Sequence, residues 1–322
     1  MTKIIGFIIL ILLAACSNTD ESYTIATSEK FTQFAEIAEK SGVSKQSIER
    51  IGQMKANQEV LYKISHPSET KPWSWYKNLL LTDERIAKGK QFSRKFQPIL
   101  DQAYIKYHIP PHYISSILGV ETFYGHKKGN YPVAQALATI GFYYPTRSTF
   151  FLHELNVLLA IEKTKKIDIF SLQGSYAGAF GMGQFMPDSY QDFAVSAKHA
   201  KTPDLINSYD DNILSIGNFL NLKGKWQQNQ PCLIEISITN LQTIALELLD
   251  QKHILWLSKD HPNFKKIYTG TPPEAVTGAL LAKEDTRVSA WLTYPNYHAI
   301  KTYNSSDMYA LLVHLLAQSI HG

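Results

Sequence analysis

The chain has 322 residues, of which 44% are hydrophobic and 12% aromatic, and its formal net charge is +4. This length and apolar content are enough for a sizeable core, in one large domain or two. The mild positive charge fits a polyanionic matrix or a membrane surface, but no basic run with interleaved aromatics is present, so no nucleic acid is expected as a partner.

The N-terminus has the layout of a secretory signal. Lys3 provides the positive start, residues 4–13 form an apolar run too short for a stable membrane span, and Ala14 and Ala15 are small. The segment that ends at Cys16, Leu-Ala-Ala-Cys, resembles the lipobox of bacterial lipoproteins, in which the signal is removed before a cysteine that then carries lipid. We therefore predict a signal peptide over residues 1–15 and lipidation of Cys16. The alternative is an ordinary signal peptide with an accidental cysteine.

Residues 16–28 are small and polar and are predicted to be a tether between the lipid and the folded region. Ser17, rather than an aspartate, follows Cys16, which favours the periplasmic face of the bacterial outer membrane as the location. A lipidated Cys16 leaves Cys232 without an intramolecular partner, so no disulfide is expected and Cys232 is predicted to be a small buried residue. No cysteine–histidine zinc spacing occurs, and neither a metal nor a cofactor is expected.

Helical patterns dominate the first third of the folded region. Residues 31–38 carry aromatic and alanine side chains at helical spacing, and residues 44–60 predict another short helix. Residues 66–75 contain two prolines and are predicted to be a loop. Thr82 is a good N-cap for a helix that runs towards Leu100.

The stretch Ile114–Gly125, ISSILGVETFYG, predicts the helix around which the chain is organised. Two prolines precede it, where a first helical turn tolerates them, and Gly125 is the predicted end. Ile117 and Leu118 lie on one apolar stripe, and Glu121 falls on the same stripe. A carboxylate on a core-facing stripe is costly to ionise, so its pKa should rise, as a general acid near neutral pH requires. The alternative is a helix-end glutamate whose head reaches water.

Residues 134–140 are apolar and predict a buried helix, and residues 150–161 predict an amphipathic one. Arg147 follows a Tyr-Tyr-Pro turn between them. The sequence alone favours a surface charge at Arg147 over a substrate contact.

Residues 172–190, LQGSYAGAFGMGQFMPDSY, form the stretch richest in glycine. We predict a tightly packed bend, because glycine allows sharp turns and close backbone approach. The bend presents Ser175 and Gln184, whose hydroxyl and amide groups can hydrogen-bond sugar hydroxyls. The alternative is helix packing through small residues.

The remaining pattern is mostly helical. Helices are predicted over residues 207–224 and 239–249, and residues 233–238 alternate as a short strand does. Residues 297–320 predict a C-terminal helical segment in which Tyr303 and Asn304 open a helix.

These features together favour an exported enzyme that cleaves carbohydrate. Glycoside hydrolysis usually needs two carboxylates. No second one has a setting as marked as that of Glu121, since Glu154, Glu162, Asp188 and Asp192 are ordinary candidates. One carboxylate suffices if the substrate supplies its own nucleophile.

The chain contains several motifs in a fixed order: Gly119-Val120-Glu121-Thr122 with Gly125, Ala136-Leu137-Ala138-Thr139, Phe142 with Tyr144-Pro145, Gly174-Ser175-Tyr176-Ala177-Gly178-Ala179, and Gly183-Gln184-Phe185-Met186-Pro187 with Ser189-Tyr190. Together they resemble the membrane-bound lytic murein transglycosylase B family. The ending Ile300-Lys301-Thr302-Tyr303-Asn304 with Tyr309 resembles it too, and the resemblance covers roughly residues 30–320.

The resemblance implies a mechanism with one glutamate, here Glu121. In that family the glutamate protonates the glycosidic oxygen between N-acetylmuramic acid and N-acetylglucosamine. Its carboxylate then takes the proton of the muramoyl C6 hydroxyl, which attacks C1 and leaves a 1,6-anhydro end. Residues implied to bind the substrate are Arg147, on its peptide or carboxylate side, and Ser175, Gln184, Asn218, Tyr303, Asn304 and Tyr309.

The chain departs from the family pattern at two places. Thr146 stands where family members often have a first arginine, so part of the peptide recognition is expected to differ. Residues 196–203, SAKHAKTP, lack the alternating acidic oxygens of a calcium loop, so no bound calcium is predicted there.

The predicted fold is mainly α, with a lysozyme-like helical catalytic core over about residues 80–225, smaller flanking helical and mixed α/β parts, and a C-terminal lobe that completes a catalytic region over residues 29–322. The expected partners are peptidoglycan glycan strands and, through the Cys16 lipid, the outer membrane. Cell-wall synthesis or secretion-machinery proteins are further candidate partners. A water-using muramidase and a non-catalytic peptidoglycan-binding lipoprotein remain as alternatives.

Overall fold

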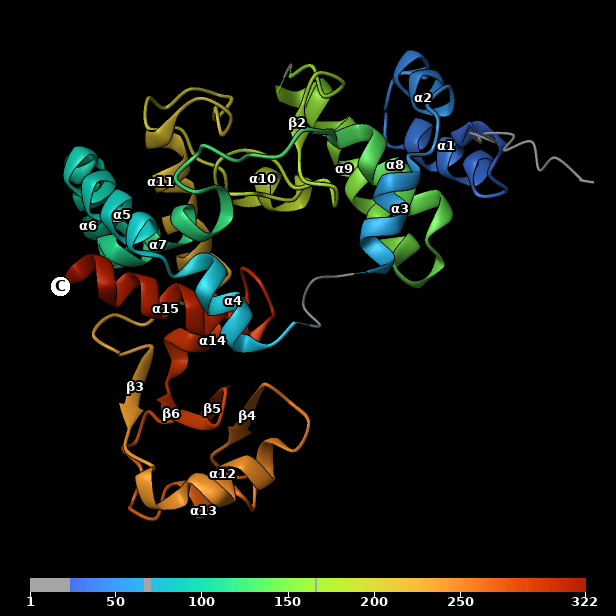
Figure 1. Ribbon diagram of the computed structural model, residues 1–322. Coiled ribbons are helices and arrows are strands. Elements are labelled where there is room, and N and C mark those ends of the chain that lie inside the picture. Colours follow the sequence, from blue (N-terminus) through green and yellow to red (C-terminus); the bar gives the residue numbers. More distant parts are fainter. Residues whose placement is uncertain (1–23, 67–70, 166) are drawn as a thin grey trace, which may run out of the picture.

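The computed structural model describes residues 24–66, 71–165 and 167–322, and it is mainly helical with small sheets (Figure 1). The fold class predicted from the sequence is thereby confirmed. The predicted signal peptide and Cys16 lie outside the described residues. No helix in the described part of the chain has the length and apolar character needed to cross a bilayer.

Three short helices form the N-terminal part of the structure, and they are α1 (Phe31–Lys40), α2 (Lys45–Gly52) and α3 (Gln58–Ser65). The predicted single helix over residues 44–60 is therefore two helices. Ser44 and Asn57 cap α2 and α3 with their side-chain oxygens.

The segment before α1 corrects the end of the predicted tether. Ile25, in a short 3-10 helix (Ile25–Thr27), is fully buried, and its N–H donates to the carbonyl oxygen of Met54 at 2.8 Å. Residues 24–28 thus belong to the folded region, because the apolar side chain of Ile25 finds a place in the core.

Three helices then lead to the central helix α7 (Pro111–Thr122), and they are α4 (Trp73–Leu80), α5 (Asp83–Lys95) and α6 (Gln97–Tyr107). Thr82 caps α5, as predicted, by accepting the N–H of Arg85 at 3.2 Å. The helix expected to run on to Leu100 is broken at Phe96, which leaves helical geometry between α5 and α6.

Helix α7 ends three residues before the predicted glycine. Phe123 and Tyr124 already have positive φ angles of 51° and 59°. The N–H of Tyr124 donates to the carbonyl oxygen of Leu118, which closes the helix as a C-terminal cap does.

The middle of the chain packs α8 (Val133–Tyr143) against α9 (Ser148–Lys165), with α3 on the other side of α8. Two short strands, β1 (Tyr131–Pro132) and β2 (Gln173–Gly174), pair at the start of the glycine-rich bend. The bend ends in α10 (Pro187–Phe193), and α11 (Tyr209–Leu222) packs on α6 and α10.

A four-stranded antiparallel sheet with the order β3-β6-β5-β4 forms the C-terminal lobe. Its strands are β3 (Leu233–Ile236), β4 (Ile254–Ser258), β5 (Gly278–Glu284) and β6 (Arg287–Thr293), and the helices α12 (Gln242–Leu249) and α13 (Phe264–Ile267) cover it. The sequence predicted only the first strand.

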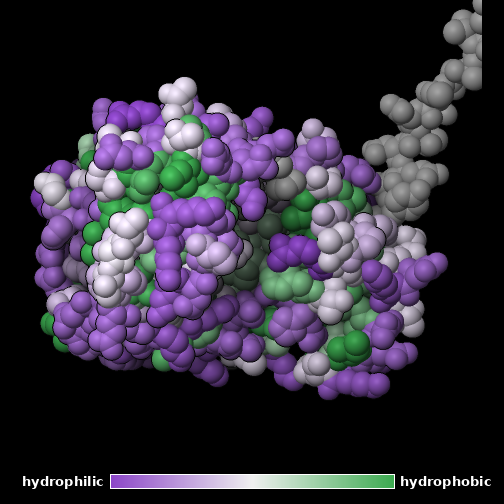
Figure 2. All heavy atoms as spheres, turned by 90° about the horizontal axis from the view of Figure 1, so that it is seen from below, coloured by the Kyte–Doolittle hydropathy of each residue, from purple (hydrophilic) through white to green (hydrophobic). Residues whose placement is uncertain are grey.

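The chain ends with α14 (Pro295–Lys301) and α15 (Asp307–His321). The predicted helix start at Tyr303 and Asn304 is early by a few residues, since Ser306 is the N-cap of α15. Helix α15 packs against α7 and α5, so the end of the chain lies across the central helix. Seen from below, the surface is hollowed between the C-terminal lobe and the side built by α3 and α8 (Figure 2).

Candidate active site

Glu121 lies in the last turn of α7. Ile117 and Leu118, which share its stripe, are fully buried, and Glu121 itself is half-buried. Burial raises the pKa of Glu121 from its ordinary 4.5 to about 7, because the charged carboxylate loses hydration. The burial of the stripe and the raised pKa agree with the prediction from the sequence, and a carboxyl group with this pKa can both give and take a proton near neutral pH.

Tyr309 is the hydrogen-bond partner of this carboxyl group. Its hydroxyl donates to Oε1 of Glu121 at 2.6 Å, which partly offsets the effect of burial on the pKa of Glu121. Tyr309 is buried in the first turn of α15, and burial together with the nearby Glu121 raises its own pKa well above 10. The phenol therefore stays protonated and remains a donor.

Tyr303 lies next to this pair. Its hydroxyl donates to the carbonyl oxygen of Gly183 at 2.5 Å, and its ring packs edge-on against Phe219 at a centroid distance of 4.8 Å. Burial, and then the charge of Glu121, raise the pKa of Tyr303 well above 10. Tyr303 thus joins the C-terminal segment to the glycine-rich bend beside the glutamate.

The bend places Gln184 in a strained conformation, with φ at +51°. Its Nε2 donates to the carbonyl oxygens of Gly181 and Lys128 at 2.9 and 3.1 Å, which leaves Oε1 as the atom for a ligand. Backbone strain of this kind persists where the surrounding structure fixes it, and it is concentrated at functional sites.

Asn212 on α11 holds the glycine-rich bend through hydrogen bonds, and the sequence analysis does not predict this role. It is fully buried, its Oδ1 accepts the N–H of Gly183 at 3.0 Å, and its Nδ2 donates to the carbonyl oxygens of Leu205 and Ser208. Asn212 lies four positions before Ile216 and so falls on an apolar stripe of α11. A polar residue on an apolar stripe is also the pattern that singled out Glu121, so the sequence contained a signal for Asn212.

A hollow of about 140 Å³ is lined by two of the predicted site residues, whereas Glu121 and Tyr309 are not among its lining residues. Gln184 and Tyr303 line it, as do Phe150 and Phe219. Arg147 is exposed, and its guanidinium lies 4.7 Å from the ring centre of Phe150. Arg147 therefore stands at the rim of this hollow, on an aromatic ring that holds it there.

The side chains of three other predicted residues make hydrogen bonds to backbone groups. Oγ of Ser175 accepts the N–H of Ala179 at 3.1 Å inside the bend, and Oδ1 of Asn304 accepts the N–H of Ser306 at 3.0 Å. Nδ2 of Asn218 donates to the carbonyl oxygen of Phe193 at 3.0 Å. None of the three is among the residues that line the hollow.

The expectation that Glu154 is an ordinary glutamate is wrong, because Glu154 is buried and its pKa is raised, as is that of Glu121. It is fully buried on α9, and burial raises its pKa to about 7. Its Oε2 accepts the N–H of Asp188 at the start of α10, at 3.0 Å, and its Oε1 has no partner among the described residues. The contact of α9 with α10 buries this carboxyl group, so periodicity along one helix could not reveal it.

Cys232 is a buried free cysteine, as predicted. Among the described residues, no group of three or more His, Cys, Asp or Glu side chains is placed to hold a metal ion. The loop over residues 196–203 is held instead by Asp211, whose carboxylate accepts the N–H groups of Ala197 and Asp204 at 2.9 and 2.8 Å.

Comparison with known proteins gives consistent matches. Residues 26–318 match the transglycosylase SLT domain family. The chain is 31% identical to membrane-bound lytic murein transglycosylase B of Escherichia coli (strain K12), over 77% of this chain and 67% of that protein.

Two solved structures from Pseudomonas aeruginosa have the same fold. The soluble lytic transglycosylase SltB1 has a TM-score of 0.79 at 30% identity, over 90% of this chain and 98% of that one. SltB3, solved in complex with NAG-anhNAM-pentapeptide, has a TM-score of 0.72 at 25% identity, over 91% of this chain and 78% of that one.

Proposed function

We propose that this chain, which belongs to the transglycosylase SLT domain family and is a lytic murein transglycosylase, cleaves the MurNAc-β-1,4-GlcNAc bond of peptidoglycan and leaves a 1,6-anhydro end. The family predicted from the sequence motifs is confirmed by this membership. The observation that carries the proposal is a single half-buried glutamate with a pKa of about 7 and a tyrosine donor on one of its oxygens.

In the first step Glu121 acts as the general acid. Because Oε1 accepts the hydroxyl of Tyr309, the transferable proton belongs on Oε2. That proton goes to the glycosidic oxygen as its bond to C1 of N-acetylmuramic acid breaks, and the N-acetylglucosamine side leaves with a free hydroxyl.

In the second step the same carboxylate acts as the base. It takes the proton of the muramoyl C6 hydroxyl, whose oxygen forms a bond to C1 and closes the 1,6-anhydro ring. Glu121 is protonated again at the end, and no water is consumed. A pKa near the working pH serves both steps, since the group must be a good acid first and a good base afterwards.

The geometry supports roles for the surrounding residues. Gln184 and Tyr303 would bind the sugar in the hollow, and Arg147 at its rim would meet a carboxylate of the stem peptide. Ser175, Asn304 and Asn218 keep their proposed roles in glycan binding.

A hydrolytic muramidase would need a second carboxylate close to the first, to act as nucleophile or to activate water. Burial and Tyr309 account for the pKa of Glu121, whereas the charged neighbours of Glu154 are Asp188 and Lys223. Glu154 is thus not among the groups that shift the pKa of Glu121, which favours the transglycosylase over the muramidase.

The relative from Escherichia coli is named as membrane-bound. We propose that this chain is membrane-bound too, through lipid on Cys16 that attaches it to the periplasmic face of the outer membrane. Metabolic labelling with a clickable fatty acid tests this, because Cys16→Ser should lose both the label and the membrane fraction. Cell-wall synthesis or secretion-machinery proteins are proposed partners at that site.

Mass spectrometry of muropeptides released from purified sacculi tests the reaction, with the chain lacking residues 1–16 as the enzyme and its Glu121→Gln variant as the control. Anhydro products, one water lighter than the products of a muramidase, are expected from the parent and not from the variant. Reducing-end products would refute the intramolecular attack, and release by the variant would refute the role of Glu121.

A further inference from the structure

A second hollow lies along α5, and its lining includes none of the residues proposed for the active site. Its volume is about 170 Å³, and its lining shares no residue with the hollow around Tyr303. The residues that line it are Lys88, Gln91, Phe92, Lys95, Phe96, Tyr124, His126 and Tyr209.

Aromatic rings make the floor of this α5 hollow. Phe92 contacts the rings of Phe96, Tyr124 and Tyr209 at centroid distances of 4.7, 5.4 and 5.8 Å, and Phe96 lies 4.7 Å from Tyr209. Phe96 and Tyr209 are only half-buried, so part of each ring faces solvent. Such a floor is suited to stacking against a sugar ring or a planar peptide group.

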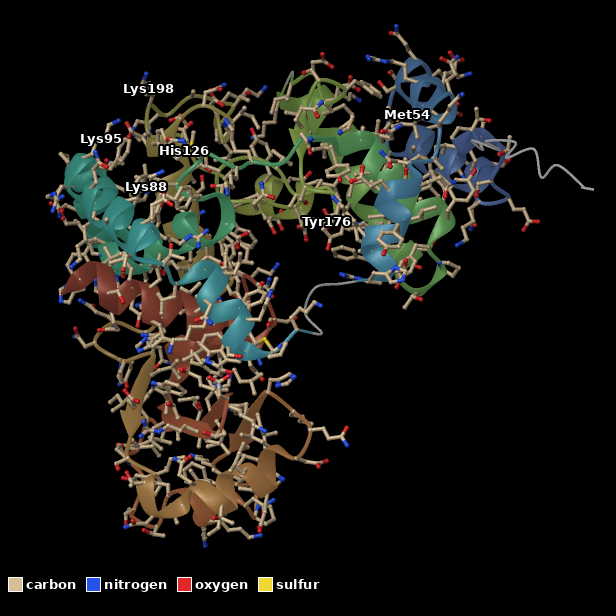
Figure 3. The ribbon with its side chains drawn as sticks, in the orientation of Figure 1. Met54, Lys88, Lys95, His126, Tyr176 and Lys198 are labelled. Carbon is tan, nitrogen blue, oxygen red and sulfur yellow. The ribbon has the colours of Figure 1, made fainter. Side chains whose placement is uncertain are left out.

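Basic side chains stand around this floor. Figure 3 shows Lys88, Lys95 and His126 close together on this side of the molecule. Lys95 and His126 are exposed, and the ammonium group of Lys95 lies 5.2 Å from the ring centre of Phe96. Lys88 pairs with Glu84 at 3.2 Å, whereas Lys95 has no carboxylate partner in the described part of the chain.

The floor is joined to the helix that carries the glutamate. The hydroxyl of Tyr124 donates to the carbonyl oxygen of Arg85 at 2.9 Å, and Nε of Arg85 donates to the carbonyl oxygen of Gly119 on α7 at 3.1 Å. A ligand in the α5 hollow would therefore rest on a rigid part of the catalytic core rather than on a loose surface segment.

We propose that the α5 hollow is an accessory binding site for the substrate polymer, in which one unit stacks on the aromatic floor while Lys95 pairs with a carboxylate of a stem peptide. The inference rests on the proposed function, since it assumes peptidoglycan as the ligand. The charge and the floor both fit this polymer, which joins sugar rings to carboxylates. The volume is below that of pockets that enclose drug-sized ligands, so the site holds a single unit of a strand that continues elsewhere.

A charge reversal with a matched control tests the proposal. Lys95→Glu and Arg94→Glu change the same charge in the same last turn of α5, and both residues are exposed, but Arg94 does not line the hollow. Each change is made in the full chain carrying Glu121→Gln, so that sacculi are bound without being cleaved, and the bound fraction is measured in detergent at low and high salt.

Lys95→Glu is expected to weaken binding to sacculi roughly fivefold at low salt, with a smaller effect at high salt, because an exposed charge contributes modestly and salt screens it. Arg94→Glu should bind as the parent does. Equal binding by the two variants would overturn the proposal. So would a loss by Lys95→Glu that occurs only on vesicles of anionic lipid, since this would assign the hollow to a membrane surface.

Turnover separates this site from the proposed function. In the chain that keeps Glu121, Lys95→Glu should raise the KM for sacculi and leave the turnover of a short soluble glycan unchanged. A parent chain that cleaves neither substrate would refute the proposed function, whatever the binding result. An equal loss on both substrates would show that Lys95 acts on the catalytic site, and would also overturn the accessory site.

Discussion

Replacement of Glu121 by glutamine is expected to abolish cleavage and, at the same time, to make the folded chain more stable above neutral pH. Glutamine keeps the shape of the side chain and an oxygen that can accept the hydroxyl of Tyr309. It removes the charge that burial disfavours.

The size of the effect follows from the pKa of Glu121. The carboxyl group loses its proton near pH 4.5 in the unfolded chain and near pH 7 in the folded one. Between these values the unfolded chain binds fewer protons, so the free energy of unfolding falls as the pH rises. The cost is absent below pH 4.5, where both states are protonated, and complete above pH 7. The difference between these two pKa values lowers the free energy of unfolding by about 3 kcal/mol if the group is fully buried. Because Glu121 is half-buried, contact with water reduces this cost to about 2 kcal/mol.

Urea unfolding at pH 4 and pH 8 measures this difference, with Glu36→Gln, an exposed glutamate on α1, as the control. Glu121→Gln should be more stable than the parent by about 2 kcal/mol at pH 8 and equal to it at pH 4. A gain of the same size at both pH values, or a loss at pH 8, would refute the reasoning. Muropeptide release by the variant should fall at least about 1,000-fold, because glutamine cannot supply the proton.

Three further changes test the parts that hold the site. Tyr309→Phe removes a hydrogen bond that lowers the pKa of Glu121, so the alkaline limb of the pH profile of kcat/KM should move to higher pH. Asn212→Ala leaves the buried N–H of the bend unpaired and should lower the free energy of unfolding by about 2–3 kcal/mol in urea. Gly129→Ala should destabilise by more than about 3 kcal/mol, since φ is +89° and the new Cβ would lie 2.1 Å from a backbone oxygen. Gly270→Ala, where the nearest atom is 3.5 Å away, is the control, and equal stability of the two variants would contradict the argument.

Local signals in the sequence predicted the parts of the structure that depend on neighbouring residues. Thr82 caps α5 because a threonine oxygen needs only the next turn to find its N–H. The end of α7 was placed at Gly125, since glycine takes a positive φ at no cost, but the chain turns already at Phe123. The packing around these residues, which the sequence does not show, holds two aromatic residues in a conformation that they rarely adopt.

The site was only partly predictable for the same reason. The stripe on α7 singled out Glu121, and the family motifs predict Tyr303 and Tyr309 as glycan-binding residues. The motifs did not show that the hydroxyl of Tyr309 donates to the carboxyl group itself. The sequence gives no sign that Glu154 is buried, because the groups that bury it come from another helix.

The sequence by itself determined the family and the helical class and singled out Glu121, because motifs and helical periodicity are properties of residues close together along the chain. Only the tertiary structure decided which groups meet. The tyrosine on Glu121 comes from 188 residues further along, and helix packing alone brings Lys95 and His126 to one aromatic floor. Such contacts depend on which faces of distant helices pack together, and packing sets the burial that gives each carboxyl group its pKa.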